Sequence, residues 1–345
     1  MLLQGRLIFR NGVINIKTPV TWVGNKTSIL PILYSVFPLE YSRYVEPFGG
    51  SGAVLLGKPS SDSFEVYNDY NKNLVNLFRC IRERPAALIK ELGFFPLNSR
   101  DDFNEIKSFF KRESFADKYI DEELELTKII LPEPNAEEII ELYKSIATDY
   151  DVRRAAMFLK LLRYSYSSSG KSFACQPFSI RSLFRLIEDV SLRLSNVVIE
   201  NQDFETLIKH YDRKETLFYC DPPYIKTEHF YSCGFGWEDH LRLRDTLLQI
   251  DGKFLLSYND CEESRKLYKN CNIVAFERRH SMAQKYEPGK QFPELLISNY
   301  DLFERYNAMP YQLNFFDTNK DNDINTIFKE KIINYGKSSL CKHTP

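Results

Sequence analysis

Five short, mainly apolar segments along the chain are each followed by acidic or amide residues. They are 44–45 before Glu46, 64–67 before Asn68-Asp69, 196–199 before Glu200 and Asp203, 216–220 before Asp221, and 253–257 before Asn259-Asp260. Helical patterns lie between several of these segments, over 71–82, 204–210, 237–250 and 261–268. Strands that alternate with helices predict an α/β fold with a parallel, doubly wound sheet. Ligands in such sheets bind beyond the carboxyl ends of the strands, where these acids would lie.

The alternation stops between about residues 84 and 193, where the sequence predicts mostly helices. Their expected ranges are 101–110, 136–146, 151–164 and 180–194, with a serine-rich loop over 165–176. We interpret 85–193 as a helical insertion between the second and third strands of a domain formed by 18–84 and 194–310. Loops and insertions at a binding edge commonly carry specificity. We expect the polar tail at 311–345 to be partly disordered.

Composition narrows the class of protein. The chain has 345 residues, 43% of them apolar, which is enough for one large domain or two. It has no run of eighteen apolar residues, and residues 1–17 lack the apolar segment of a signal peptide, so we expect neither a membrane span nor secretion. Seven cysteines without C-x-x-C spacing and five histidines without a metal motif predict reduced thiols, a cytoplasmic location and no metal.

Charge is nearly balanced overall but uneven along the chain. The net charge is −1, yet 101–141 holds thirteen acids and five bases, net −8, and 151–193 holds eight bases and three acids, net +5. The basic stretch suits a nucleic-acid surface. Two ordinary solvated helical faces are the alternative that charge alone leaves open.

The loop 46–52 after the first predicted strand contains three glycines, which permit a tight turn and a close approach of ligand to backbone. A phosphate would be repelled by Glu46, whereas a cationic, phosphate-free nucleoside such as S-adenosylmethionine would be attracted. After the second and third strands, Asp69 is placed to accept ribose hydroxyls, and Asp203-Phe204 to bind an adenine amino group and cover its ring. Helix caps are the alternative for both acids. Trp22, one of two tryptophans in the chain, would on its own be interpreted as a buried structural residue.

The segment Asp221-Pro222-Pro223-Tyr224 is more specific. Proline pushes Asp221 into an extended conformation, and two prolines remove N–H donors and stiffen the loop. The Asp221 carboxylate and the Pro222 carbonyl then form an acceptor pair for the two N–H groups of an exocyclic amine. Tyr224 can stack on the flat base that carries the amine.

Taken in order, these motifs resemble the Dam-type (α-group) site-specific DNA adenine-N6 methyltransferases, the D-P-P-Y family. The matching motifs are W-x-G-x-K at 22–26, E-P-F-x-G-x-G at 46–52, N-D-x-N at 68–71, D-F at 203–204 and D-P-P-Y at 221–224. Similarity continues through 257–260 and 294–300, so the resemblance covers most of 18–301. It implies a Rossmann-like S-adenosylmethionine-dependent catalytic domain with a target-recognition domain at 85–193.

The resemblance also implies roles for individual residues. Methyl transfer to N6 of a flipped adenine in double-stranded DNA would use Asp221, Pro222, Pro223 and Tyr224. Cofactor-contacting positions by the same comparison are Trp22, Lys26, Glu46, Phe48, Gly50, Asp69, Asp203, Phe204 and Asp221. Candidate DNA contacts in the basic stretch are Arg153, Arg154, Lys160, Arg163, Tyr164, Lys171, Arg181 and Arg185.

Two departures from the family pattern concern the target sequence rather than the chemistry. Asn25 precedes Lys26 where the family has glycine, and 164–173 lacks the family's usual specificity motif, which puts a GATC target in doubt. We expect a monomer of an orphan, phage or restriction-modification type, in the last case with a cognate endonuclease. An RNA methyltransferase and a non-catalytic DNA-binding protein with a relic cofactor site are the alternatives.

Overall fold

A computed structural model describes residues 16–22, 24–59, 63–93, 99–110, 120–147, 151–166, 172–174, 179–226, 234–279 and 291–308. Contacts divide the described chain into two compact units. The first unit draws on 1–25, 50–56 and 71–201, and the second on 26–49, 57–70 and 202–345. The expected tail at 311–345 lies outside the described residues, and the domain boundaries at 84 and 194 stay a prediction.

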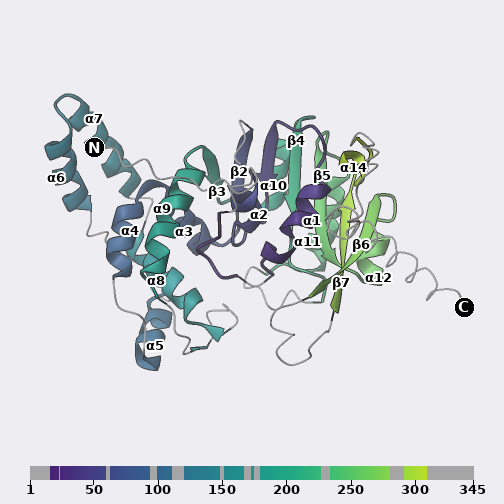
Figure 1. Ribbon diagram of the computed structural model, residues 1–345, viewed down its shortest axis with the longest axis horizontal. Helices are drawn as coiled ribbons and strands as arrows, with labels where there is room; N and C mark the ends of the chain where they lie inside the picture. Colours follow the sequence, from purple (N-terminus) through teal and green to yellow (C-terminus); the bar gives the residue numbers. More distant parts are fainter. Residues whose placement is uncertain are drawn as a thin grey trace, which may run out of the picture. The chain divides into compact units, whose positions relative to one another are not determined.

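Seven strands form one sheet in the order β3-β2-β1-β4-β5-β7-β6 (Figure 1). Their bounds are β1 Arg43–Glu46, β2 Phe64–Asn68, β3 Val197–Glu200, β4 Thr216–Cys220, β5 Lys253–Asn259, β6 Asn272–Arg279 and β7 Gln291–Ser298. All five predicted apolar segments therefore form strands. Every residue of β4 is buried, as expected for a central parallel strand that is covered on both faces.

Parallel pairing brings the acidic ends of the strands to one edge of the sheet. β1 pairs in parallel with both β2 and β4, and β4 pairs in parallel with β5. In this register Glu46 lies opposite Tyr67, and Cys220 lies opposite Leu256. The residues that follow β1, β2, β4 and β5 therefore share the carboxyl edge, where a ligand is expected to bind.

The predicted parallel sheet is confirmed for β2, β1, β4 and β5, and at one edge it continues into antiparallel strands that the sequence did not predict. β7 runs antiparallel to β5, and β6 runs antiparallel to β7. Only the eleven residues 280–290 connect β6 to β7. A parallel pair needs a crossover of about a dozen residues or more, whereas antiparallel neighbours accept shorter connections.

The helices of the second unit follow the expected amphipathic spacing. α10 buries Phe204, Leu207, Ile208 and Tyr211, which recur every three or four residues on one face. The elements are η1 Thr27–Ile29, α1 Leu30–Ser35, α10 Phe204–Tyr211, α11 Trp237–Leu247, α12 Glu262–Leu267 and α14 Glu304–Ala308. The predicted helices at 204–210, 237–250 and 261–268 are thus confirmed, with small changes in their ends.

The first unit is mainly helical. Its helices are α3 Lys72–Glu83, α4 Pro85–Leu92, α5 Arg100–Phe109, α6 Ile120–Ile130, α7 Asn135–Ala147, α8 Val152–Arg163 and α9 Ser182–Leu194, and the short α2 Ala53–Gly57 begins there as well. α8 packs against α3, α4 and α5. The sequence did not predict α4 or α6, although Pro85 at the first turn of α4 is a typical start signal.

Candidate active site

Asp221 stands at the carboxyl end of β4, and a buried lysine holds it. Nζ of Lys26 lies 2.6 Å from Oδ2 of Asp221, with 4% of the lysine side chain and 20% of the aspartate side chain exposed. Lys26 is the residue immediately before η1 and lies 195 positions before Asp221 in the chain. Pro222 and Pro223 are buried. The predicted acceptor loop is therefore fixed at its acid by an ion pair as well as by its prolines.

Tyr224 lies beside this ion pair. Nζ of Lys26 is 5.1 Å from the centroid of the Tyr224 ring, and the ring of Tyr258 in β5 is 6.0 Å from it at an interplanar angle of 33°. The buried Tyr258 hydroxyl in turn forms a hydrogen bond with Nδ1 of the buried His240 in α11. Residues of neighbouring elements, Lys26 and Tyr258, therefore lie beside the ring of the candidate stacking residue.

Asn259 fixes the chain just after the loop. Its Nδ2 group, at the end of β5, donates a 3.2 Å hydrogen bond to the carbonyl of Ile225. The sequence placed Asn259 in a later strand of the family and gave it no role. The signal that the sequence offered for such a role was the amide side chain at the end of the strand that lies next to β4.

Glu46 is almost fully enclosed at the end of β1. Only 2% of it is exposed, and the Tyr44 hydroxyl donates to its Oε1 at 2.6 Å. Burial first, and the Glu46 carboxylate second, raise the pKa of Tyr44 well above its usual value, so the tyrosine stays a donor. The next turn requires glycine at Gly49, because an added Cβ would come within 2.3 Å of a Tyr67 ring atom.

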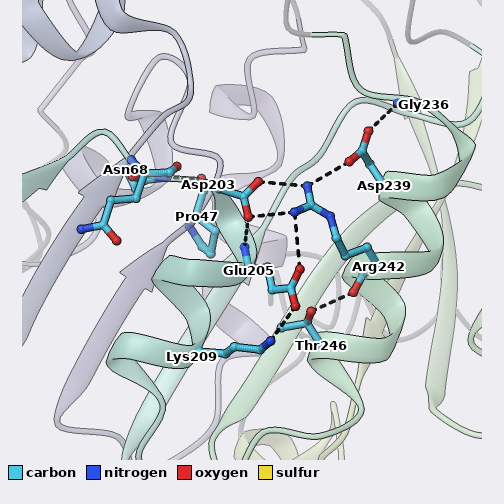
Figure 2. A network of polar contacts seen from close by, with 10 residues as sticks. Pro47, Asn68, Asp203, Glu205, Lys209, Gly236, Asp239, Arg242 and Thr246 are labelled. Atoms are coloured by element: carbon cyan, nitrogen blue, oxygen red, sulfur yellow. Dashed lines mark hydrogen bonds and ion pairs between the residues drawn. The ribbon is translucent and has the colours of Figure 1, made fainter.

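Asn68 ties together the loops that follow three strands. Asn68, which Figure 2 shows beside Pro47, donates from Nδ2 to the carbonyl oxygen of Pro47 at 2.9 Å. The same Nδ2 donates to the carbonyl oxygen of Gln202 at 3.1 Å, and Oδ1 of Asn68 accepts from the Gln202 amide at 2.8 Å. Asp69, which follows it, is half-buried. Sequence reasoning singled out Asp69 for a ligand and missed the structural role of Asn68.

Asp203 and Phe204 begin α10. Oδ1 of Asp203 accepts a 3.0 Å hydrogen bond from the Glu205 amide, so this acid caps the helix, as the alternative interpretation expected. The buried Phe204 ring lies 5.4 Å from Phe48 and 5.8 Å from Phe235. The structure therefore gathers Phe48, Asp203 and Phe204, three of the predicted cofactor contacts, in one place.

Trp22 and Gly50 meet within the first unit. Gly50 has φ of +51°, and a Cβ added there would lie 3.2 Å from Cδ1 of the Trp22 ring. The indole also packs edge-on to Phe158 of α8, with centroids 6.4 Å apart. Glycine at position 50 thus serves both the turn and the close approach of Trp22.

The candidate DNA contacts differ in their surroundings. Arg153 and Arg181 are exposed, whereas Tyr164 is buried against Phe103 and Leu161. The guanidinium of Arg163 donates to the carbonyl of Pro19, and burial lowers its pKa to about 10. Arg154 donates to Oδ1 of Asn73, and burial lowers the pKa of Lys160. Arg185 is exposed, and Lys171 lies outside the described residues. Which of them touch DNA stays a prediction.

Within the described ranges, no three or more His, Cys, Asp or Glu side chains form a group able to hold a metal ion. Cys80, Cys220, Cys261 and Cys271, the cysteines in those ranges, form no disulfide. The helices described also include none that is long and apolar enough to cross a membrane.

Comparison with known proteins gives the family. A family model for D12 class N6 adenine-specific DNA methyltransferases matches residues 22–282. The Type II methyltransferase M1.LlaDCHI of Lactococcus lactis subsp. cremoris is 26% identical over 314 residues, which cover 85% of this chain and 99% of the relative. The Type II methyltransferase M.MjaIII of Methanocaldococcus jannaschii is 28% identical over 83% of this chain and 99% of its own length.

A DNA adenine methylase of Haemophilus influenzae is 25% identical to this chain, over 80% of it and 91% of the relative. The matched segment of the family model contains the loops that follow β1, β2, β3 and β4, together with Lys26 and Arg242. It also spans well over half of the 345 residues. The chain therefore belongs to the D12 class of N6 adenine-specific DNA methyltransferases.

Proposed function

We propose that Asp221, Pro222 and Tyr224 hold the target adenine of DNA while its amino nitrogen is methylated. The observation that carries this assignment is the Lys26–Asp221 ion pair at the carboxyl end of the fully buried β4, directly beside the Tyr224 ring. A carboxylate in a fixed orientation, next to a stacking face, supports a role in binding a flat base that carries an amine.

The chemistry follows from the amine itself. The lone pair of an adenine amino nitrogen is delocalised into the ring, which makes the nitrogen a poor nucleophile. The Asp221 carboxylate and the Pro222 carbonyl would each accept a hydrogen bond from one of its two N–H groups. This arrangement favours a tetrahedral nitrogen whose lone pair is directed away from the ring. Prolines at 222 and 223 offer no competing N–H donor. Most of the rate enhancement would then come from positioning and electrostatics.

Tyr224 would stack on the adenine after the base has left the duplex, as enzymes that act on a base require. The neighbouring Tyr258 ring and the Lys26 ammonium restrict the Tyr224 ring before any base arrives. A ring with restricted motion loses less entropy on binding. We propose that the amino proton released after transfer leaves to solvent through Asp221.

The family uses S-adenosylmethionine, and the residues at the strand ends fit it. The ammonium, ribose hydroxyls and adenine amino group of this cofactor are all hydrogen-bond donors, and Glu46, Asp69 and Asp203 are acceptors. Trp22, Phe48, Gly50 and Phe204 would supply contacts to its apolar parts, and Lys26 would support the site through Asp221. When bound, the cofactor supplies a methyl group on a sulfonium centre.

Double-stranded DNA would lie against the basic stretch, where Arg153 and Arg181 are exposed. Contacts to phosphate make affinity fall steeply with salt. The Type II methyltransferase relatives favour a restriction-modification context with a cognate endonuclease. We propose that the enzyme acts as a monomer in the cytoplasm, without a metal.

The direct test is incubation with duplex DNA or RNA and methyl-labelled cofactor, followed by separation of the nucleosides. We expect N6-methyladenine from DNA with the wild type and none above background with Asp221→Ala. Asp260→Ala is a matched control, because Asp260 also follows a strand and pairs with a cation, Arg265 at 2.6 Å. Label in RNA alone, or near-normal turnover by Asp221→Ala, would refute the proposal.

A further inference from the structure

Arg242 of α11 forms a bidentate ion pair with the Asp203 carboxylate through both terminal nitrogens of its guanidinium. Nη1 lies 3.0 Å from Oδ1 and Nη2 lies 2.9 Å from Oδ2 of Asp203 (Figure 2). Two parallel N–H···O bonds of this kind fix the plane of a carboxylate as well as its distance. Arg242 belongs to none of the motifs that the sequence singled out.

The same side chain also restrains Phe204. The central guanidinium carbon of Arg242 lies 4.3 Å from the centroid of the Phe204 ring. This distance suits a cation–π contact. One side chain therefore contacts both residues of the D-F turn.

We propose that Arg242 is a positioning residue that orients Asp203 to accept the adenine amino group of the cofactor. The inference rests on the proposed role of Asp203 in cofactor binding and adds the residue that controls it. Arg242 would act through Asp203 and Phe204, without touching the reacting atoms.

Most acceptor positions of the Asp203 carboxylate are occupied, so its orientation decides where the remaining one points. An ionised carboxylate has about four acceptor positions, two on each oxygen. On Asp203, Oδ1 accepts from the Glu205 amide and from Nη1 of Arg242, and Oδ2 accepts from Nη2 of Arg242. Within these contacts, one acceptor position remains, on Oδ2. It matches a single N–H of an adenine amino group.

Arg242 is itself held in place. Its Nη2 donates at 2.9 Å to Oδ1 of Asp239 on the same helix, and Oδ2 of Asp239 accepts from the Gly236 amide at 2.9 Å. Glu205 adds a longer 3.4 Å contact from the other side, and Lys209 pairs with Glu205 at 2.6 Å. The guanidinium thus connects the start of α11 to the start of α10 (Figure 2).

The exposure of the pair argues for positioning rather than stability. The Arg242 and Asp203 side chains are 39% and 34% exposed. Ion pairs this accessible to solvent contribute little to folding. Removing the guanidinium should therefore leave the protein folded and free the Asp203 carboxylate to rotate.

The test compares Arg242→Met, Arg242→Lys, Asp203→Asn and the double variant Arg242→Met/Asp203→Asn by calorimetry with S-adenosylhomocysteine and by steady-state kinetics. We expect Arg242→Met to weaken binding and raise KM for the cofactor about tenfold, while kcat stays within about twofold. Arg242→Lys should fall between, because an ammonium cannot form the bidentate pair. The double variant should bind no more weakly than Asp203→Asn alone.

Arg244→Met is the control, because Arg244 lies on the same helix but pairs with Asp245 at 2.6 Å. A cofactor analogue whose purine lacks the amino group separates this proposal from the one it rests on. If the wild type binds both purines equally, the placing of adenine at Asp203 fails, and this proposal with it. If the wild type prefers the amino form and Arg242→Met keeps that preference in full, or loses kcat rather than KM, only the role of Arg242 is refuted.

Discussion

Asp221 and Asp203 follow strands of the same sheet, and each meets a cation, but the two pairs are built differently. Lys26 is buried and places one ammonium on one oxygen of Asp221, whereas Arg242 is partly exposed and spans both oxygens of Asp203. Lysine is a compact point charge and arginine a planar fork. The first pair fixes a charge inside the protein, and the second fixes the plane of a carboxylate at the surface.

The difference separates two uses of a strand-end acid. A buried ion pair is costly to break, because the remaining charge has lost its solvent and its partner. Breaking an exposed pair changes the free energy of unfolding little, because water replaces the partner. We therefore infer that the Lys26–Asp221 pair supports both the fold and methyl transfer, and that the Arg242–Asp203 pair serves recognition of the cofactor.

The largest expected effect is at Asp221. Asp221→Asn keeps the shape of the side chain but replaces one acceptor oxygen with a donor and removes the charge. We expect the single-turnover rate of methyl transfer at saturating cofactor to fall by about 10²–10³-fold or more, the usual loss for a preorganised polar group. Asp260→Asn, measured alongside, should keep the wild-type rate.

The next effect is on stability. Lys26→Met leaves the Asp221 carboxylate largely buried without its cation, so the free energy of unfolding should fall by about 3 kcal/mol. Adding Asp221→Asn to it removes the orphaned charge and should restore most of the loss, but not the activity. Urea denaturation measures both; equal stability of wild type and Lys26→Met would contradict the comparison.

A smaller effect is expected at the stacking face. Tyr224→Ala should weaken binding of the extrahelical adenine by roughly 1–3 kcal/mol, the worth of one base–aromatic stack. Tyr224→Phe keeps the ring and should stay close to the wild type. A fluorescent base analogue at the target position reports the extrahelical base; an undiminished signal with Tyr224→Ala would exclude stacking there.

The smallest effect is the change in stability at Arg242. Arg242→Met should alter the free energy of unfolding by less than about 1 kcal/mol, because the pair that it breaks is partly exposed. The same urea experiment with Arg244→Met sets the scale for a surface ion pair on this helix. A loss at Arg242 as large as that of Lys26→Met would remove the distinction between the two pairs.

Much of the fold could be predicted because each strand signal is local. Apolar segments followed by acids give the strands β1 to β5, and the periodic spacing of apolar residues gives α10 and α11. The antiparallel edge of β7 and β6 was not predicted, since strand direction depends on connection length and on pairing across the sheet. The prolines and the acid at 221–224 could also be interpreted from the local sequence alone.

The partners of the site residues were harder to predict because they come from distant positions. Lys26 lies 195 residues from Asp221, and Arg242 lies 39 residues from Asp203. Asn68 joins the loops at Pro47 and Gln202 only because their strands end at one edge of the sheet. No spacing in the sequence encodes such contacts; they follow from strand order.

The most direct test of this account measures single-turnover methyl transfer to duplex DNA across a range of cofactor concentrations, for Asp221→Asn and Asp203→Asn side by side. We expect the rate of Asp221→Asn to stay about 10²-fold or more below that of the wild type even at saturation. Asp203→Asn should need more cofactor but approach the wild-type rate when saturated. A saturated rate near that of the wild type for Asp221→Asn, or equal losses in both variants at saturation, would contradict it.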